Sequence, residues 1–133
     1  MKQIKEVCVL SGLSKRTLQF YDDKCLLNVS RTEDNYRIYS DEDLDRLWLI
    51  LIYKEMGFSL SEVSELLDSG DEETRTIIAD KMIEIEVEIS ELERKYRFID
   101  KVMRYGIPDR NSSYVTDGDM NLAEYAKILS ERI

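Results

Sequence analysis

Hydrophobic residues recur along most of this chain at the three-to-four-residue spacing that places them on one face of an α-helix. The pattern predicts six helices, at about residues 4–11, 15–24, 41–56, 60–68, 71–105 and 122–132. Residues 29–39 break the pattern and contain an Asp34-Asn35 pair suited to a tight turn, so they predict a β-hairpin. We therefore expect a mainly α fold with one small hairpin.

Turn and capping residues mark the ends of the first two helices. Helix 4–11 carries an apolar face that includes Val7 and Leu10, and Gly12 follows it where the backbone must turn tightly. Ser14 is placed to cap the next helix through its hydroxyl group. Two short helices joined by a tight turn are typical of a helix-turn-helix, whose second helix enters the major groove of DNA.

The second helix has Leu18 on its apolar side and a polar side that can reach phosphates and base edges. The residues that we assign to this exposed side are Lys15, Arg16, Thr17, Gln19 and Tyr21. A solvent-exposed face that binds nothing has a similar composition, so this helix alone leaves DNA contact open.

Helix 71–105 has apolar residues whose intervals alternate between four and three, which is the a/d pattern of a coiled coil. These residues are Ile78, Met82, Ile85, Ile89, Leu92, Tyr96, Ile99 and Met103. A helix of roughly 50 Å cannot bury such a seam within so small a domain, so we expect dimerisation through it. The alternative is an intramolecular helical hairpin, for which helix 122–132 is short.

Helix 41–56 is apolar nearly all round over Leu47–Tyr53, which predicts burial on more than one side. One side can cover the helix-turn-helix, and the other can meet the long helix of a second copy. Such a contact would couple the DNA-binding heads to the coiled coil.

Charge is distributed unevenly along the chain, whose net charge is −9. Residues 1–40 hold seven Lys/Arg and five Asp/Glu, a balance of +2, whereas residues 59–133 hold ten and eighteen, a balance of −8. A phosphate contact depends on the local potential, because charges beyond about 8–10 Å are screened in physiological salt. A mildly basic DNA-reading surface on an acidic protein is therefore physically reasonable.

Several classes of function find no support in the residue content. The chain has no His and only two cysteines, Cys8 and Cys25, so we expect no metal site, no cofactor and no disulfide framework. It has no glycine-rich phosphate loop and no nucleophile with a partner at readable spacing, so we expect no catalytic residues and no enzyme activity. The longest uncharged apolar run, Leu47–Tyr53, is far shorter than the roughly 20 residues that span a bilayer. With no secretory signal visible, we expect a cytoplasmic protein without a membrane partner.

Four stretches of the chain carry a resemblance to a known family. They are KEVCVLSGLSKRTLQFYDD (5–23), LL (26–27), RTEDNYRIYSDEDLDRL (31–47) and EMGFSLSEVSELL (55–67). In order and spacing they resemble the MerR family of transcriptional regulators. The resemblance implies a winged-helix DNA-binding domain, a long antiparallel coiled-coil dimerisation helix and a variable C-terminal effector region. It also implies a bound dimer that distorts a promoter with an overlong spacer, with RNA polymerase as a further partner.

The resemblance implies roles for individual residues as well. Tyr36 and Arg37 match the family's phosphate-contacting pair in the wing, and Arg31 is expected to join them. Asn35 stands at the usual Gly of the wing turn, and Asn tolerates positive φ. Gln19 replaces a common Arg, so it either reads adenine or marks a lost phosphate contact.

We therefore expect three regions: a winged-helix DNA-binding domain at 1–69, a coiled-coil dimerisation helix at 70–106 and a short effector or packing tail at 107–133. Cys25 replaces another common Gly, which puts the geometry of the loop after the second helix in question. The expected function is that of a homodimeric regulator that binds double-stranded promoter DNA sequence-specifically. The alternatives are an excisionase-like or architectural DNA-bending protein, and a coiled-coil adaptor whose head no longer binds DNA.

Overall fold

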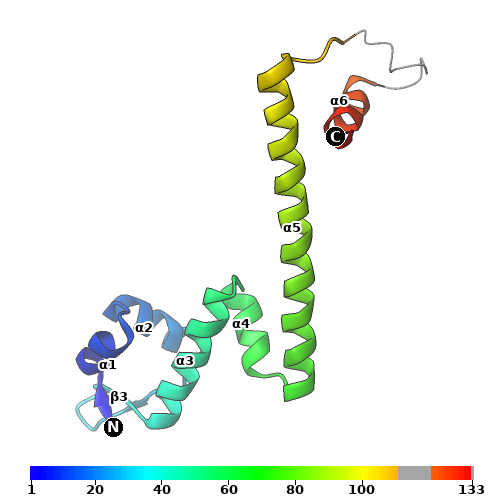
Figure 1. The fold of residues 1–133 in the computed structure, drawn as a ribbon. Coiled ribbons are helices and arrows are strands. Elements are labelled where there is room, and N and C mark those ends of the chain that lie inside the picture. Colours follow the sequence, from blue (N-terminus) through cyan, green and yellow to red (C-terminus); the bar gives the residue numbers. More distant parts are fainter. Residues whose placement is uncertain (111–120, 133) are drawn as a thin grey trace. The chain divides into compact units, whose positions relative to one another are not determined.

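The computed structural model describes residues 1–110 and 121–132 of the chain (Figure 1). Contacts divide the chain into two compact units, Met1–Thr74 and Arg75–Ile133. The elements, in chain order, are β1 (Lys2–Gln3), α1 (Ile4–Ser11), α2 (Lys15–Asp23), β2 (Ser30–Arg31), β3 (Arg37–Tyr39), α3 (Asp41–Glu55), α4 (Leu60–Leu67), α5 (Asp71–Tyr105) and α6 (Leu122–Glu131). The mainly α fold class predicted from the hydrophobic spacing is confirmed.

The helices of the first unit begin and end where the capping residues predict. Gly12 ends α1 with a left-handed backbone at φ 75°, and the Ser14 hydroxyl accepts a hydrogen bond from the Thr17 amide at 3.1 Å. Ser40 and Ser59 each form a capping box at the start of α3 and α4. Because these interactions are local, the sequence predicts the bounds of all four helices to within one residue.

The expected hairpin is part of a three-stranded antiparallel sheet in the order β1-β3-β2. Ser30 pairs with Ile38 across the hairpin, and Lys2 pairs with Tyr39 on the other side of β3. Strand β1 was not predicted because two residues are too few to show the alternation that marks a strand. The central strand of the wing is thereby tied to the start of α1.

The core of the first unit contains a side chain with no exposed surface from each of α1, α2, β3, α3 and α4. These side chains are Val7, Leu18, Tyr39, Ile50 and Val63, each with 0% of its surface exposed. Leu10, which was expected on the same apolar face as Val7, is 64% exposed, so this face of α1 is buried only in part. The core nevertheless fixes α2 against α1 and the sheet.

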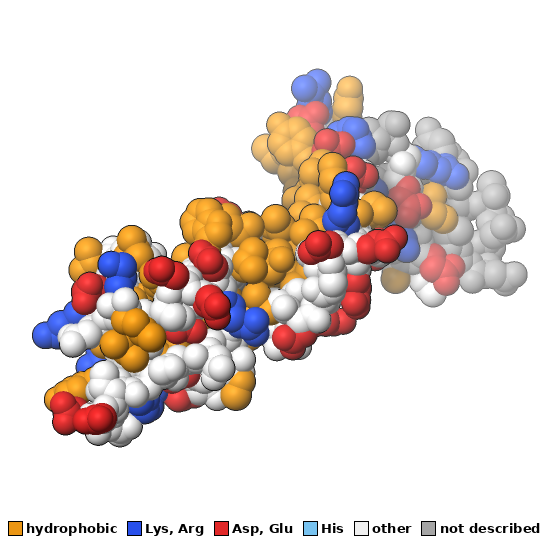
Figure 2. Space-filling model, turned by 90° about the horizontal axis from the view of Figure 1, so that it is seen from below, with side chains coloured by type: hydrophobic (Ala, Val, Ile, Leu, Met, Phe, Trp, Pro, Cys, Tyr) orange, Lys and Arg blue, Asp and Glu red, His pale blue; other side chains and the backbone are white. Residues whose placement is uncertain are grey.

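Helix α3 buries one side within its own unit and leaves apolar side chains on another. Leu47, Ile50 and Tyr53 are buried, whereas Trp48 is 62% and Leu49 is 42% exposed. Figure 2 shows that hydrophobic side chains, coloured orange, reach the surface of the molecule. The prediction of burial on one side is confirmed, and the second contact of α3 remains a prediction for a partner chain.

Helix α5 contains 35 residues and buries none of them. Its apolar seam stays open to solvent, with Leu92 64%, Tyr96 75% and Met103 80% exposed. An isolated helix of this kind leaves a continuous apolar stripe in water, which is unfavourable unless another helix covers it.

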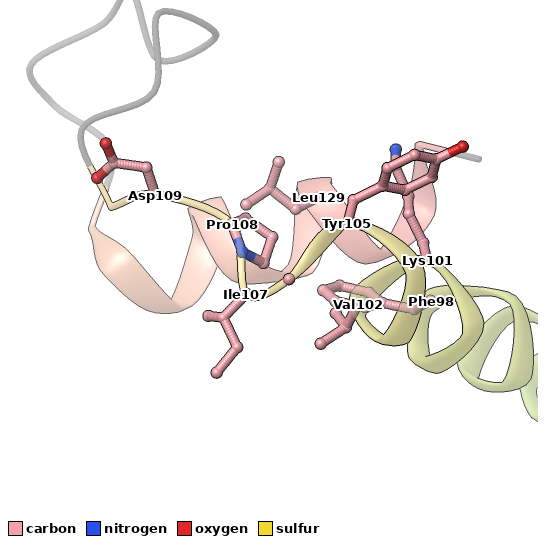
Figure 3. A pocket seen from close by; sticks show the side chains of 9 residues that line it. Phe98, Lys101, Val102, Tyr105, Ile107, Pro108, Asp109 and Leu129 are labelled. Carbon is pink, nitrogen blue, oxygen red and sulfur yellow. The ribbon is translucent and has the colours of Figure 1, made fainter.

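Helix α6 packs against the C-terminal half of α5. Arg94 on α5 donates a hydrogen bond to the Ser130 hydroxyl at 2.5 Å. An apolar hollow of about 430 Å³ lies between the two helices, and Figure 3 shows Phe98 and Val102 from α5 and Leu129 from α6 around it. The expected tail, 107–133, includes residues 111–120, which lie outside the described residues.

Candidate nucleic-acid interface

Helix α2 presents its first turn to solvent as the sequence predicts. Lys15 and Arg16 are exposed, and Thr17 and Gln19 are half-buried. The Thr17 hydroxyl lies 2.9 Å from the Ser14 hydroxyl, so the side chains at the start of the helix are ordered by its cap. A positive helix N-terminus flanked by two cations is suited to phosphate binding.

Tyr21 does not lie on the exposed side of α2, which corrects the sequence prediction. The residue is 7% exposed and its ring belongs to the core. The reason is the helix period: Tyr21 follows Leu18 by three residues, so both point to the same buried face. Burial also raises the pKa of the Tyr21 hydroxyl, and whether this hydroxyl meets a phosphate remains a prediction.

Phe20 and Lys24 extend the exposed row of α2 and were missed among the expected site residues. Phe20 is 42% exposed, and the Lys24 ammonium lies 5.6 Å from the centre of its ring, within cation–π range. Both residues follow Arg16 at intervals of four, so the helix period gave a signal that they share a face.

The wing turn is closed by its own backbone. The Thr32 amide donates to the Tyr36 carbonyl at 2.8 Å, and the Asn35 amide donates to the Thr32 carbonyl at 2.9 Å. Asn35 adopts φ 66°, so its expected tolerance of positive φ is confirmed. The exposed Arg31 side chain donates to the Asn35 carbonyl at 3.1 Å, and Tyr36 is 68% exposed. Arg31 and Tyr36 therefore stand together near the wing tip.

Arg37 has a different environment from the other expected DNA contacts. Its Nε donates to Asp22 Oδ2 at 2.8 Å, and its second nitrogen lies 3.5 Å from Asp23 Oδ1. Only 15% of the Arg37 side chain is exposed. The expected phosphate-contacting arginine is thus already engaged by two carboxylates of α2.

The described residues 1–110 and 121–132 contain no cluster of His, Cys, Asp or Glu that can hold a metal ion. None of the helices described in those two ranges is both long and apolar enough to cross a membrane. Lys/Arg and Asp/Glu side chains are interspersed over the face shown in Figure 2, coloured blue and red. The cationic groups that matter for a polyanion are therefore the local ones on α2 and the wing.

A capped second helix beside a short antiparallel wing defines a winged helix-turn-helix, a class of DNA-binding domain. The family profile described as "MerR HTH family regulatory protein" matches residues 2–70, and the profile described as "MerR, DNA binding" matches residues 44–100. The chain belongs to the MerR family.

Known proteins similar to this chain include regulators and their solved structures. The HTH-type transcriptional activator mta of Bacillus subtilis (strain 168) is 54% identical over 67 residues, which cover 50% of this chain and 26% of that protein. The crystal structure of MtaN, the N-terminus of the Bacillus subtilis multidrug transporter activator, is 36% identical, with a TM-score of 0.73, and covers 77% of this chain and 98% of that one. The structure of HiNmlR, a MerR family regulator lacking the sensor domain and bound to promoter DNA, is 27% identical, with a TM-score of 0.55, and covers 78% of this chain and 84% of that one. The chain spans 26% of the length of the first curated relative and 53% of the length of the next.

Proposed function

We propose that this protein is a homodimeric transcription regulator that binds double-stranded promoter DNA through α2 and the wing. The observation that carries the proposal is the pairing of two surfaces in one chain. One is the exposed cationic row on α2 beside an exposed wing tip, and the other is an uncovered apolar seam on α5. A relative bound to promoter DNA supports the same reading.

Each residue of the interface has a role that its position supports. Lys15, Arg16 and Arg31 are exposed cations suited to phosphate contacts, which fix the register of a protein on DNA. Gln19 is half-buried on the reading side of α2 and is either an adenine contact or a softened backbone contact. Tyr36 at the wing tip is exposed and can reach a phosphate through its hydroxyl.

Dimerisation through the seam is supported by the face of α5 that α6 leaves free. Residues that line the hollow against α6, such as Phe98 and Val102, lie to one side of the seam formed by Leu92, Tyr96 and Ile99, roughly 90–130° round the helix at 3.6 residues per turn. The alternative of an intramolecular hairpin is thereby weakened, because the described part of the tail covers another face. An antiparallel partner helix, together with a contact to the exposed Trp48 of α3, would bury both apolar surfaces.

A regulator of this kind acts by binding and distorting DNA and catalyses no reaction, so we infer that the protein is not an enzyme. We infer further that it works in the cytoplasm and affects transcription by RNA polymerase through the shape of the promoter. The rival readings are an architectural DNA-bending protein and an adaptor with an inactive head.

The test is affinity selection from random duplex DNA, followed by footprinting on the enriched sequence and on promoter DNA that contains it. We expect a protected dyad within a promoter. Protection of recombination-site DNA alone would favour the bending protein, and no enrichment at all would overturn the proposal. The matched pair Lys15→Ala and Lys54→Ala separates the reading helix from an exposed lysine near the end of α3, and only the first should weaken binding.

A further inference from the structure

The ion pair between Asp22 and Arg37 joins helix α2 to the central strand of the wing sheet. The two residues are 15 positions apart, their atoms lie 2.8 Å apart, and their side chains are only 17% and 15% exposed. We propose that Asp22 is a positioning residue for DNA binding, which contacts no DNA itself but fixes the wing to the reading helix through Arg37. This inference rests on the proposed function and specifies how its two DNA-facing elements are held together.

The register of β3 explains why Arg37 faces α2. Side chains alternate along a strand, so Arg37 lies on the same side as Tyr39, whose surface is 0% exposed. Ile38 and the exposed Tyr36 take the other orientation. An arginine on the inward side of a strand needs a partner for its charge, and Asp22 near the end of α2 provides one.

The wing needs such a link because its own pairing is short. Strand β2 has two residues and β3 has three, and each neighbour of β3 pairs with it at only two positions. Isolated two-stranded hairpins are at best marginally stable in water, and β1 adds only two further paired positions. A charge-assisted hydrogen bond that is largely shielded from solvent is stronger than a neutral one, and a guanidinium fixes direction as well as distance.

Asp23 provides a matched control on the same helix. It also faces Arg37, but at 3.5 Å and with a side chain that is 69% exposed. Solvent screens such a contact, so its contribution to the wing is small. Asp22→Asn and Asp23→Asn remove the same charge at adjacent positions, and only the first removes it from the acceptor of the shielded hydrogen bond with Arg37.

The two possible roles of Arg37 predict opposite changes in DNA affinity for Asp22→Asn. If Arg37 contacts phosphate, removing a neighbouring carboxylate frees it and binding tightens. If Asp22 positions the wing, Asp22→Asn weakens binding roughly tenfold, as expected for loss of a shielded charged hydrogen bond, although the protein becomes less acidic. Asp23→Asn leaves binding unchanged or slightly tighter.

Binding is measured on the selected duplex and on scrambled DNA at two salt concentrations, with wild type, Asp22→Asn, Asp23→Asn, Asp22→Glu, Arg37→Gln and the double variant Asp22→Asn/Arg37→Gln. We expect Arg37→Gln to weaken binding without changing the slope of log K against log salt, and the double variant to be no weaker than Arg37→Gln. Asp22→Glu, which keeps the carboxylate, should recover part of the loss. Tighter binding by Asp22→Asn, or a slope reduced by about two units per dimer in Arg37→Gln, would overturn the proposal.

Amide hydrogen exchange in the DNA-free protein tests the link independently of DNA binding. We expect Asp22→Asn, but not Asp23→Asn, to speed exchange at the Thr32 and Asn35 amides of the wing turn while the core of α3 stays protected. Equal protection in both variants would overturn the link. If wild type selects no DNA, the proposed function fails, and the exchange result still decides whether Asp22 holds the wing.

Discussion

Replacing Ile89 and Leu92 by Asp places two carboxylates per chain in the middle of the α5 seam. Both side chains are open to solvent in the single chain, Ile89 by 49% and Leu92 by 64%. If a partner helix covers them, each substitution removes the apolar surface that the partner would bury and leaves a charge in its place. We expect the double variant to be monomeric at concentrations at which the wild type is a dimer.

The size of the effect follows from the exposed fractions. Complete burial of a Leu or Ile side chain is worth about 1.5–3 kcal/mol, so burying the exposed parts of these two contributes roughly 3–7 kcal/mol per dimer. Its loss weakens association by about 300-fold to 100,000-fold. Desolvation of the new carboxylates adds to this loss, so the figure is a lower bound for a seam that is fully covered.

Sedimentation equilibrium at micromolar concentration measures the association directly, and circular dichroism verifies that the helix persists. Val87→Asp with Ser90→Asp is the matched control, because it adds the same two charges at the same three-residue spacing on α5, outside the seam. We expect the control to remain dimeric. A wild type that is already monomeric, or an Ile89→Asp/Leu92→Asp variant that stays dimeric, would refute the coiled-coil reasoning.

Three further predictions concern single side chains. Among the described residues the fully buried Tyr39 hydroxyl has no hydrogen-bond partner, so Tyr39→Phe should raise the free energy of unfolding by about 1–3 kcal/mol in denaturant titration. Burial raises the Tyr39 pKa, so the folded state favours the neutral phenol. The free energy of unfolding should therefore fall as pH rises above about 10 in the wild type, and fall less steeply in Tyr39→Phe. An equally steep alkaline decline in both proteins would contradict a raised Tyr39 pKa as the cause. Cys25 adopts φ 61°, so Cys25→Gly should add up to about 1 kcal/mol by relieving left-handed strain, whereas Asn35→Gly should change little; equal effects would show that strain is not the reason. Gln19→Arg should tighten binding to cognate and scrambled DNA alike and steepen the salt dependence, and a loss confined to one base pair in Gln19→Ala would show instead that Gln19 reads adenine.

Local interactions explain which parts of the fold could be predicted from the sequence. A cap such as Ser14 or Ser40 acts on amides within three residues, and a hydrophobic repeat is visible along its own helix. Strand β1 could not be found this way, because its only signal is pairing with β3 more than 30 residues away. The resemblance to a known family identified the wing, but only the structure shows that β1 makes it a three-stranded sheet.

In the candidate site, too, the features that depend on local sequence could be predicted and those that depend on tertiary contacts could not. Exposure of Lys15 and Arg16 follows from the helix period, and the burial of Tyr21 could have been read from its distance of three residues from Leu18. The environment of Arg37 could not be predicted from the sequence, because Asp22 and Asp23 are remote in sequence and nothing local to the wing indicates a carboxylate partner. Residue type predicted a cation at this place, and only tertiary structure shows what the cation faces.

The pairing of Arg37 with Asp22 also changes how the charge balance should be understood. A net charge of −9 opposes approach to DNA, and two acidic residues lie directly at the end of the reading helix. Pairing with Arg37 at 2.8 Å offsets the charge of Asp22 at the C-terminal end of α2, while acidic groups beyond about 8–10 Å are screened by salt. One ion pair thus fixes the wing and limits local repulsion of phosphate. Binding then depends on the geometry of a few exposed cations rather than on overall charge. This dependence disfavours non-specific DNA binding and makes the correct placement of the wing decisive.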